Sequence, residues 1–379
     1  MNIRKWIKFI SSIALLFTII TGSNSSCSKP TPSSSTPRDT TINPPPDTTH
    51  TTDTIPNPPP TDTSAAGVYI GGSKLKPEGW DYSAAYWKND SLKQLSTSLY
   101  SVVTGIYVNN KDVYFTIASG GNSAFSYLKN GVSIPSPVDE LGYNHDAYGI
   151  TMLNGDVYTT GTAHQSPYLN YCAIYQVNNN NLVYLEPPAI SVNNSWGYAI
   201  AVVNNDVYVA GHFGYKATYW KNGQKTTLPF DTTGGNFYSR VNSICANNGD
   251  MYMAGILGSA PPSDASYDLR GIAVYWKNDS LVKLTSSRPA TANSIAVVNG
   301  DVYVAGSVFG EDLLPRAAYW KNGELHLLND GYSEARAIAI HGTDIYIAGH
   351  INYDQAIYWK NEVPVSLGRG RATSIFIAN

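Results

Sequence analysis

Short runs of alternating apolar and small residues recur in a fixed order from residue 67 to the end of the chain. The first is apolar with small residues, as in residues 294–298, and the second reads Asp-Val-Tyr-Val-Ala-Gly, as in residues 301–306. The third reads Ala-Ala-Tyr-Trp-Lys-Asn-Gly in residues 317–323 and leads into an apolar tail. Alternation rich in Val, Ile, Tyr and Trp is typical of half-buried strands. Each unit therefore predicts four short β-strands.

The unit occurs seven times, at intervals of roughly 40 to 55 residues, which is the period of propeller blades. Residues that recur at one register in most units are best explained by architecture, so we interpret the repeated tyrosines and tryptophans as packing between strands. The aspartate before each Val-Tyr is interpreted as part of a hairpin rather than as a calcium ligand. One isoleucine marks the centre of each first run: Ile106, Ile150, Ile200, Ile244, Ile295, Ile338 and Ile375.

Asparagine and glycine pairs separate the first run from the second and follow the third, as at Asn154-Gly155 and Asn222-Gly223. These residues accept the positive φ angles of two-residue type I′ turns. We therefore expect strands one and two, and strands three and four, of every unit to be joined tightly at one face. All variation in loop length then falls on the opposite face, where rigid scaffolds commonly carry binding residues.

The two ends of the repeat region predict how the ring closes. The region begins with a second-run strand, residues 68–71, and ends with an orphan first-run strand, residues 373–378. Pairing of these two strands would remove the free sheet edges. The sequence therefore predicts an all-β fold, a seven-bladed β-propeller with four-stranded antiparallel blades, over residues 67–379, whose first blade is closed by the C-terminal strand.

The repeats resemble those of bacterial, Bacteroidetes-like envelope lipoproteins that are built from Ala-x-Tyr-Trp-Lys-Asn-Gly units and are otherwise uncharacterised. More distantly they resemble extracellular repeats with an Ala-Phe-x-Trp core. The resemblance covers residues 67–379 and implies a propeller, but it implies no catalytic residues.

Composition narrows the classes of function. Only 14% of the residues are charged and the formal net charge is -3, so no basic surface for nucleic acid is expected. Cys172 and Cys245 are scattered and no Cys-x-x-Cys pair exists, which argues against a disulfide framework or a zinc site. The chain also lacks phosphate-loop, haem and nucleophile-elbow motifs. We therefore expect no metal, no cofactor and no nucleic-acid partner.

The N-terminus carries the features of an export signal. Basic residues precede an apolar run, residues 10–20, and small polar residues follow it. Ser25 and Ser26 before Cys27 make residues 1–26 resemble a bacterial lipoprotein signal peptide, which implies lipidation of Cys27; Asn24 departs from that pattern. Simple secretion is the alternative.

Residues 27–66 consist largely of Pro, Thr, Ser and Asp and cannot bury a core, so we expect a disordered, semi-rigid tether. Together these segments predict an exported protein, lipid-anchored at the outer membrane or cell surface, with a periplasmic or secreted form as the alternative. We expect a monomer that meets the membrane only through its N-terminal lipid.

Side chains two residues before each first-run isoleucine should approach the mouth of the central channel, and so should those two positions earlier. The first register holds Thr104, Tyr148, Tyr198, Asn242, Asn293, Arg336 and Thr373. The second holds Val102, Asp146, Trp196, Arg240, Thr291, Glu334 and Arg371. The ten members other than Val102 and the threonines are candidate ligand-binding residues, whose rings could stack on a ligand and whose polar groups could bind hydroxyls or carboxylates. The alternative is that they close the channel with hydrogen bonds among themselves and water.

These candidates favour a cell-envelope propeller that binds a glycan or a peptide or protein on its loop-bearing face. A structural scaffold within an envelope complex is the alternative. A glycan hydrolase or lyase is less favoured, because its acid and base would have to come from Asp146 and Glu334, which lie in distant repeats. His212 and His350 occupy equivalent positions in the fourth and seventh units and are not expected to share a metal.

Replacing Cys27 with Ala should remove the acyl anchor, because the thiol is the group that would be acylated. When the bacterium is fractionated, the unchanged protein should be found with the membranes and the variant in the fraction without membranes. Unchanged membrane association of the variant would contradict the lipoprotein prediction.

Overall fold

The computed structural model describes residues 66–96, 99–119, 127–134, 144–165, 170–186, 194–230, 238–258, 271–286 and 288–379. The signal peptide, Cys27, and residues 27–65 of the expected tether lie outside these ranges. Within them the chain forms strands β1 to β27 and turns, and no helix long and apolar enough to cross a membrane is found there. The protein is therefore an all-β propeller of small antiparallel sheets.

Five of the sheets have four strands each, and each sheet is built from consecutive strands. The first two are β4 (Ser101–Asn109), β5 (Asp112–Ser119), β6 (Tyr127–Lys129) and β7 (Val132–Ile134), then β8 (Asn144–Leu153), β9 (Asp156–Gln165), β10 (Asn170–Val177) and β11 (Asn180–Tyr184). The third is β12 (Ser195–Val203), β13 (Asp206–Phe213), β14 (Lys216–Lys221) and β15 (Gln224–Thr227). The last two are β16 (Tyr238–Asn247), β17 (Asp250–Gly258), β18 (Ile272–Lys277) and β19 (Ser280–Lys283), then β20 (Ala290–Val298), β21 (Asp301–Phe309), β22 (Pro315–Lys321) and β23 (Glu324–Leu327).

The sixth sheet has seven strands and contains both ends of the repeat region. Its strands, in spatial order, are β24 (Ser333–His341), β25 (Asp344–Ile351), β26 (Gln355–Lys360), β27 (Val363–Ala378), β1 (Gly67–Leu75), β2 (Tyr82–Lys88) and β3 (Ser91–Gln94). The first part of β27 pairs with β26 and its last part pairs with β1. The C-terminal strand thus pairs with β1 as expected, but it does so within a sheet that also contains the last repeat.

Six sheets, rather than seven separate ones, result from this shared strand. The sequence predicted an orphan strand at residues 373–378, whereas β27 already begins at Val363 as the outer strand of the last repeat. The two pairings follow each other directly, because Arg369 pairs with Gln355 of β26 and the next residue, Gly370, pairs with Lys74 of β1. The strand therefore passes from one partner to the other without interruption.

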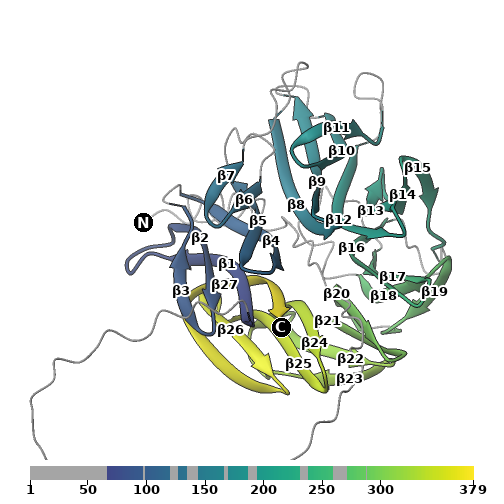
Figure 1. The fold of residues 1–379 in the computed structure, drawn as a ribbon. Helices are drawn as coiled ribbons and strands as arrows, with labels where there is room; N and C mark the ends of the chain where they lie inside the picture. Colours follow the sequence, from purple (N-terminus) through teal and green to yellow (C-terminus); the bar gives the residue numbers. More distant parts are fainter. Residues whose placement is uncertain are drawn as a thin grey trace, which may run out of the picture.

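The inner strands of the described chain follow one another around a closed ring (Figure 1). Each contacts the next in the cyclic order β27, β4, β8, β12, β16, β20, β24 and back to β27. The core lies between neighbouring sheets, where the third-run tryptophans are at most 1% exposed: Trp87, Trp220, Trp276, Trp320 and Trp359. Their expected packing role is confirmed.

The tight turns share one set of side-chain contacts. In the sheet formed by β12–β15, Asn222 has a φ of 49°, its Oδ1 accepts from the backbone N–H of Val207, and its Nδ2 donates to Asp206. Lys221 binds the same carboxylate at 2.8 Å and lies over the ring of Tyr208. Equivalent contacts recur in other repeats, for example at Asp344. The repeated aspartate is therefore part of the hairpin, as predicted.

Replacing Ile375 with Ala should lower the free energy of unfolding by about 2–5 kcal/mol, because this 1% exposed side chain lies where β27 closes the ring. Replacing Ile377, a half-buried residue on the same strand, should cost less. Urea unfolding of the two purified variants would measure the difference. Equal losses would contradict a closing role for the buried position.

Candidate functional site

A β-bulge interrupts every inner strand at the same place. One residue per strand has no partner on the second strand of its sheet, because the register shifts there. The bulged residues are Thr104, Tyr148, Tyr198, Asn242, Asn293, Arg336 and Thr373. These are the residues that the sequence placed at the first register of the channel mouth, so the expected equivalence of the seven positions is confirmed.

The repeated Ala-Gly at the end of the second run explains how the bulge fits. A Cβ built on Gly211 would lie 1.8 Å from the backbone oxygen of Trp196, and one on Gly349 would lie 2.0 Å from that of Glu334. Gly72, Gly255 and Gly306 meet the same obstacle. At these five positions no side chain can occupy the space, and Gly161 holds the same position in a sixth repeat, whereas the seventh has Ile117 there.

Four bulged side chains hydrogen-bond to the next sheet around the ring. Thr104, Asn242 and Asn293 donate to the backbone oxygens of Ala147, Ala292 and Ala335, each at 2.8 Å. Thr373 donates in the same way to Val103. For Asn242 and Asn293, which are 0% and 7% exposed, these contacts favour the alternative that the residues close the channel.

Tyr148, Tyr198 and Arg336 depart from this pattern. The two tyrosine rings pack on each other with centroids 5.7 Å apart. Arg336 instead pairs with Glu334 of its own strand. The departures mark two places on the inner strands where side chains make contacts that the other repeats do not share.

The first place is an aromatic run across three successive sheets, formed by Tyr171, Trp196, His212 and Tyr238. Trp196 stacks on Tyr171 at 4.9 Å and on His212 at 4.6 Å between ring centroids. Because two protein rings already stack on Trp196, it offers little open face to a ligand. Trp196 is held firmly, but it is a less accessible platform than the sequence suggested.

His212 is 3% exposed, and neither of its ring nitrogens has a hydrogen-bond partner within the described part of the chain. Burial and the nearby charge of Arg240 lower the pKa of His212 to about 3. Arg240 itself is buried, and half-buried Asp146 lies near Tyr148 and Tyr171, since its charge contributes to the raised pKa of both. Arg240 and Asp146 therefore belong with the aromatic run.

The second place is an arginine cluster on the seven-stranded sheet, formed by Tyr332, Glu334, Arg336, His350, Tyr353 and Arg371. Glu334 forms an ion pair with Arg336 and accepts a 3.0 Å hydrogen bond from Tyr332. Burial alone would raise the pKa of Glu334, but the charges of Arg336, His350 and Arg371 outweigh it and lower the pKa to about 2. Glu334 is thus a carboxylate at neutral pH.

Arg371 and Tyr353 complete the cluster from the loop side. The Nε of Arg371 donates to the backbone oxygen of Tyr353 at 3.1 Å, and the Tyr353 ring stacks on Tyr332 with centroids 3.7 Å apart. Tyr353 has a φ of 67°, which is unfavourable for a bulky residue, and its side chain is 47% exposed. An exposed ring is therefore fixed beside a guanidinium group.

Further exposed rings lie on connections next to β1 and β2 of the same sheet. Tyr82, whose pKa the charge of Arg371 influences, packs edge-on against Tyr100, and Tyr100 is 45% exposed. Trp80 is 58% exposed, on a loop held by Arg369, which donates to the backbone oxygens of Lys76 and Pro77. The loop-bearing end of the seven-stranded sheet therefore combines open aromatic surface with charge.

The structure divides the ten sequence candidates into three groups. Tyr148, Trp196, Tyr198, Arg240 and Asp146 accompany the aromatic run, Glu334, Arg336 and Arg371 form the arginine cluster, and Asn242 and Asn293 join neighbouring sheets. Asp146 and Glu334 belong to different clusters, which gives the less favoured acid and base no common site. In the described ranges no group of three or more His, Cys, Asp or Glu side chains could hold a metal ion.

Sequence reasoning missed Tyr332, Tyr353 and Tyr171. Tyr353 could have been found, because it occupies the second position of an Asn-initiated turn, where the repeat elsewhere uses glycine, asparagine or an acidic residue. Tyr332 and Tyr171 have no such signal, because each lies at the variable edge of a loop. The sequence also predicts Tyr168, Tyr267 and Asp268 on the loop-bearing face, and these three residues lie outside the described ranges.

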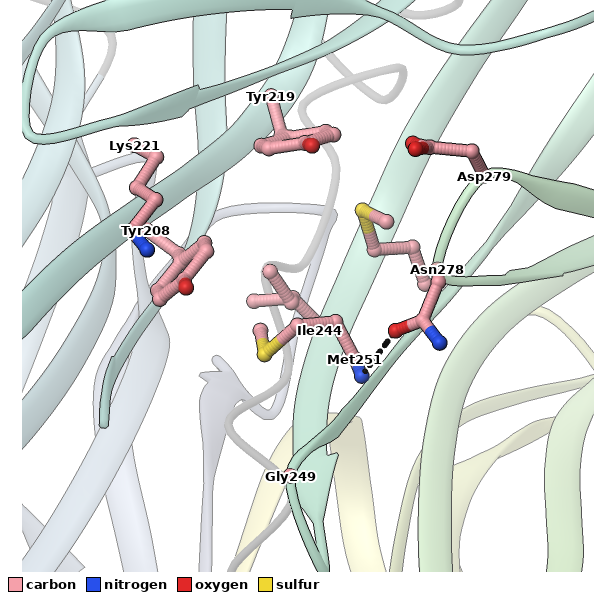
Figure 2. A pocket seen from close by; sticks show the side chains of 9 residues that line it. Tyr208, Tyr219, Lys221, Ile244, Gly249, Met251, Asn278 and Asp279 are labelled. Carbon is pink, nitrogen blue, oxygen red and sulfur yellow. Dashed lines mark hydrogen bonds between the residues drawn. The ribbon is translucent and has the colours of Figure 1, made fainter. Parts of the chain in front are cut away.

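A separate cleft of about 290 Å³ opens at the tight-turn end, between the sheets β12–β15 and β16–β19 (Figure 2). Tyr208, Tyr219, Met251, Met253 and Asp279 are among its lining residues. Its other polar groups serve the turns: Lys221 pairs with Asp206, and Asn278 accepts from the backbone N–H of Met251. No sequence candidate lines this cleft, so it is a weaker site than the loop-bearing face.

No described protein family and no curated protein matches the chain. Among solved structures, it is similar to the catalytic domain of the Coprinopsis cinerea GH62 α-L-arabinofuranosidase, with 9% identity, a TM-score of 0.32, and coverage of 57% of this chain and 88% of that one. A Bacillus subtilis arabinanase gives 11%, 0.31, 61% and 93% in the same order. An acylaminoacyl peptidase is similar with 10% identity and a TM-score of 0.41, and the match covers 79% of this chain and 50% of that one. At these TM-scores the similarities carry no argument about function.

The buried histidines predict how stability depends on pH. Burial lowers the pKa of both His212 and His350 to about 3, below the ordinary value of 6.5. The unfolded chain therefore binds more protons as the pH falls through 6.5, and the free energy of unfolding should decrease, with a slope that approaches about 1.4 kcal/mol per pH unit for each histidine near pH 5. Urea unfolding at several pH values would measure this slope.

Replacing His212 with Phe should remove about half of that slope, because the ring packing is kept and the titrating group is lost. Replacing His341, which is exposed, serves as the control and should leave the slope unchanged. A His212→Phe variant with the full slope would show that His212 is not held neutral in the fold.

Proposed function

We propose that this chain is an exported, lipid-anchored, seven-bladed propeller that binds a glycan on its loop-bearing face, at the arginine cluster. The seven blades follow if β27 is counted in two blades, as the closed order of inner strands suggests. The resemblance of the N-terminus to lipoprotein signals supports the envelope address.

One observation carries the choice of site: Trp80, Tyr100 and Tyr353 are about half exposed on connections that charged side chains hold, those of Arg369, Asp81 and Arg371 respectively. A sugar ring has an apolar C–H face, which can cover an aromatic ring, and hydroxyls at its edge, which can bind charged groups. Aromatic side chains with neighbouring hydrogen-bonding groups match both properties. The aromatic run has fewer open faces, so we assign it the role of a rigid support.

The rigidity of the arginine cluster also favours binding. The stack on Tyr332 holds the ring of Tyr353, and the hydrogen bond from Arg371 to its backbone oxygen holds the turn, so little freedom is left for a ligand to remove. A strained turn residue that is fixed by two neighbours is typical of positions that serve recognition.

Replacing Tyr353 with Gly should weaken glycan binding about tenfold, because it removes an exposed ring, while the positive φ of the turn suits glycine. The control is Tyr215→Ala, which removes a 54% exposed ring from the loop between β13 and β14, away from the cluster. A glycan array followed by calorimetry on the best ligand would measure both variants.

Unchanged affinity of the Tyr353→Gly variant would exclude this cluster as the binding site. If the folded wild-type protein binds no glycan, the proposed function itself is wrong, and capture of envelope proteins becomes the test of the scaffold alternative.

A further inference from the structure

We propose that the sugar unit held at the arginine cluster carries a carboxylate, so that the protein recognises an acidic glycan such as one containing uronate. This inference rests on the proposed function and names the ligand class of the same site.

The balance of charge in the cluster is the first argument. Arg336 and Arg371 both act on the single carboxylate of Glu334, and the two guanidinium groups also repel each other. Burial lowers the pKa of His350 to about 3 and raises the pKa of Tyr332, so neither group carries a charge at pH 7. The cluster therefore carries one positive charge in excess, although the whole chain has a formal net charge of -3.

Burial strengthens this argument. The side chains of Arg336 and Glu334 are only 17% and 18% exposed, and desolvation is the largest contribution to the lowered pKa of Arg371. Water screens charges weakly in such surroundings, so an additional carboxylate would be attracted more strongly than at an open surface. At the same time, the exposed fraction leaves the groups within reach of a ligand.

The geometry of Arg371 is the second argument. Its Nε donates to the backbone oxygen of Tyr353, which anchors the guanidinium group to the turn that carries the exposed ring. A planar guanidinium group matches the two oxygens of a carboxylate. A sugar ring packed on Tyr353 would place a carboxylate at its edge close to this group.

The unrepeated origin of these residues is the third argument. The six side chains come from the loop before β24, from β24, β25 and β27, and from the turn after β25. At the register of Glu334 and Arg371, other repeats carry Val102, Asp146, Trp196, Arg240 and Thr291, so no shared architectural need explains a cluster with two guanidiniums and one carboxylate.

The test measures binding of uronate oligosaccharides to the purified full-length protein, each beside its carboxyl-reduced, neutral counterpart. Galacturonate, glucuronate and mannuronate oligomers form the panel. We expect at least one uronate to bind, with the reduced form about tenfold weaker, as the loss of one charge-assisted contact implies. The preference should shrink as salt is raised.

Two variants test the assignment to the cluster. Arg371→Gln should weaken uronate binding about tenfold and leave binding of the reduced form unchanged. Arg316→Gln is the matched control, because Arg316 is 21% exposed on the same face but is neutralised by a bidentate pair with Asp312. It should leave both affinities unchanged.

The outcomes separate the two proposals. Equal binding of uronates and their reduced forms would overturn the inference and leave the glycan-binding function standing. Binding of sulfated oligosaccharides without uronates would also overturn the carboxylate assignment. If no glycan of either kind binds, both proposals fail.

Discussion

The bulge in every inner strand is the constraint on which the rest of the propeller depends. In five repeats it brings a backbone oxygen so close to the second strand that the facing position, as at Gly211 and Gly349, cannot carry a side chain. The bulge also turns one side chain per sheet toward the next sheet, where Thr104, Asn242, Asn293 and Thr373 hydrogen-bond. A repeated backbone irregularity thus joins the sheets around the channel and, in the same step, creates seven equivalent positions that substitution can convert to other uses.

At three of these positions the side chain is a tyrosine or an arginine rather than a threonine or an asparagine. Tyr148 and Tyr198 pack ring against ring beside the aromatic run, and Arg336 forms an ion pair with Glu334. The exposed ring of Tyr353 belongs to the same cluster as Arg336, whereas stacking partners cover both faces of Trp196.

Much of the fold could be predicted, because the same local sequence pattern occurs seven times. Asparagine turns, the Asp–Lys–Asn contacts and buried tryptophans all follow from local chemistry that each unit repeats. The candidate site could be predicted only in part. The registers of the bulge and of Glu334 and Arg371 were found, because they are fixed by distance from an isoleucine. Tyr332 and Tyr353 were missed, because loop residues follow no such distance and their contacts depend on how two loops meet.

The sequence by itself determined the all-β architecture, the face with tight turns, the closing role of the C-terminal strand and the seven equivalent positions at the channel mouth, since each of these depends on local periodicity. Only the tertiary structure decided that β27 joins two repeats into one sheet, that Asn242 and Asn293 bind the neighbouring sheet, and that Trp196 lies between two rings. It also decided that Arg336 and Arg371 share one carboxylate. These outcomes depend on contacts between residues distant in the chain, and the spacing of residues along one strand carries no information about them.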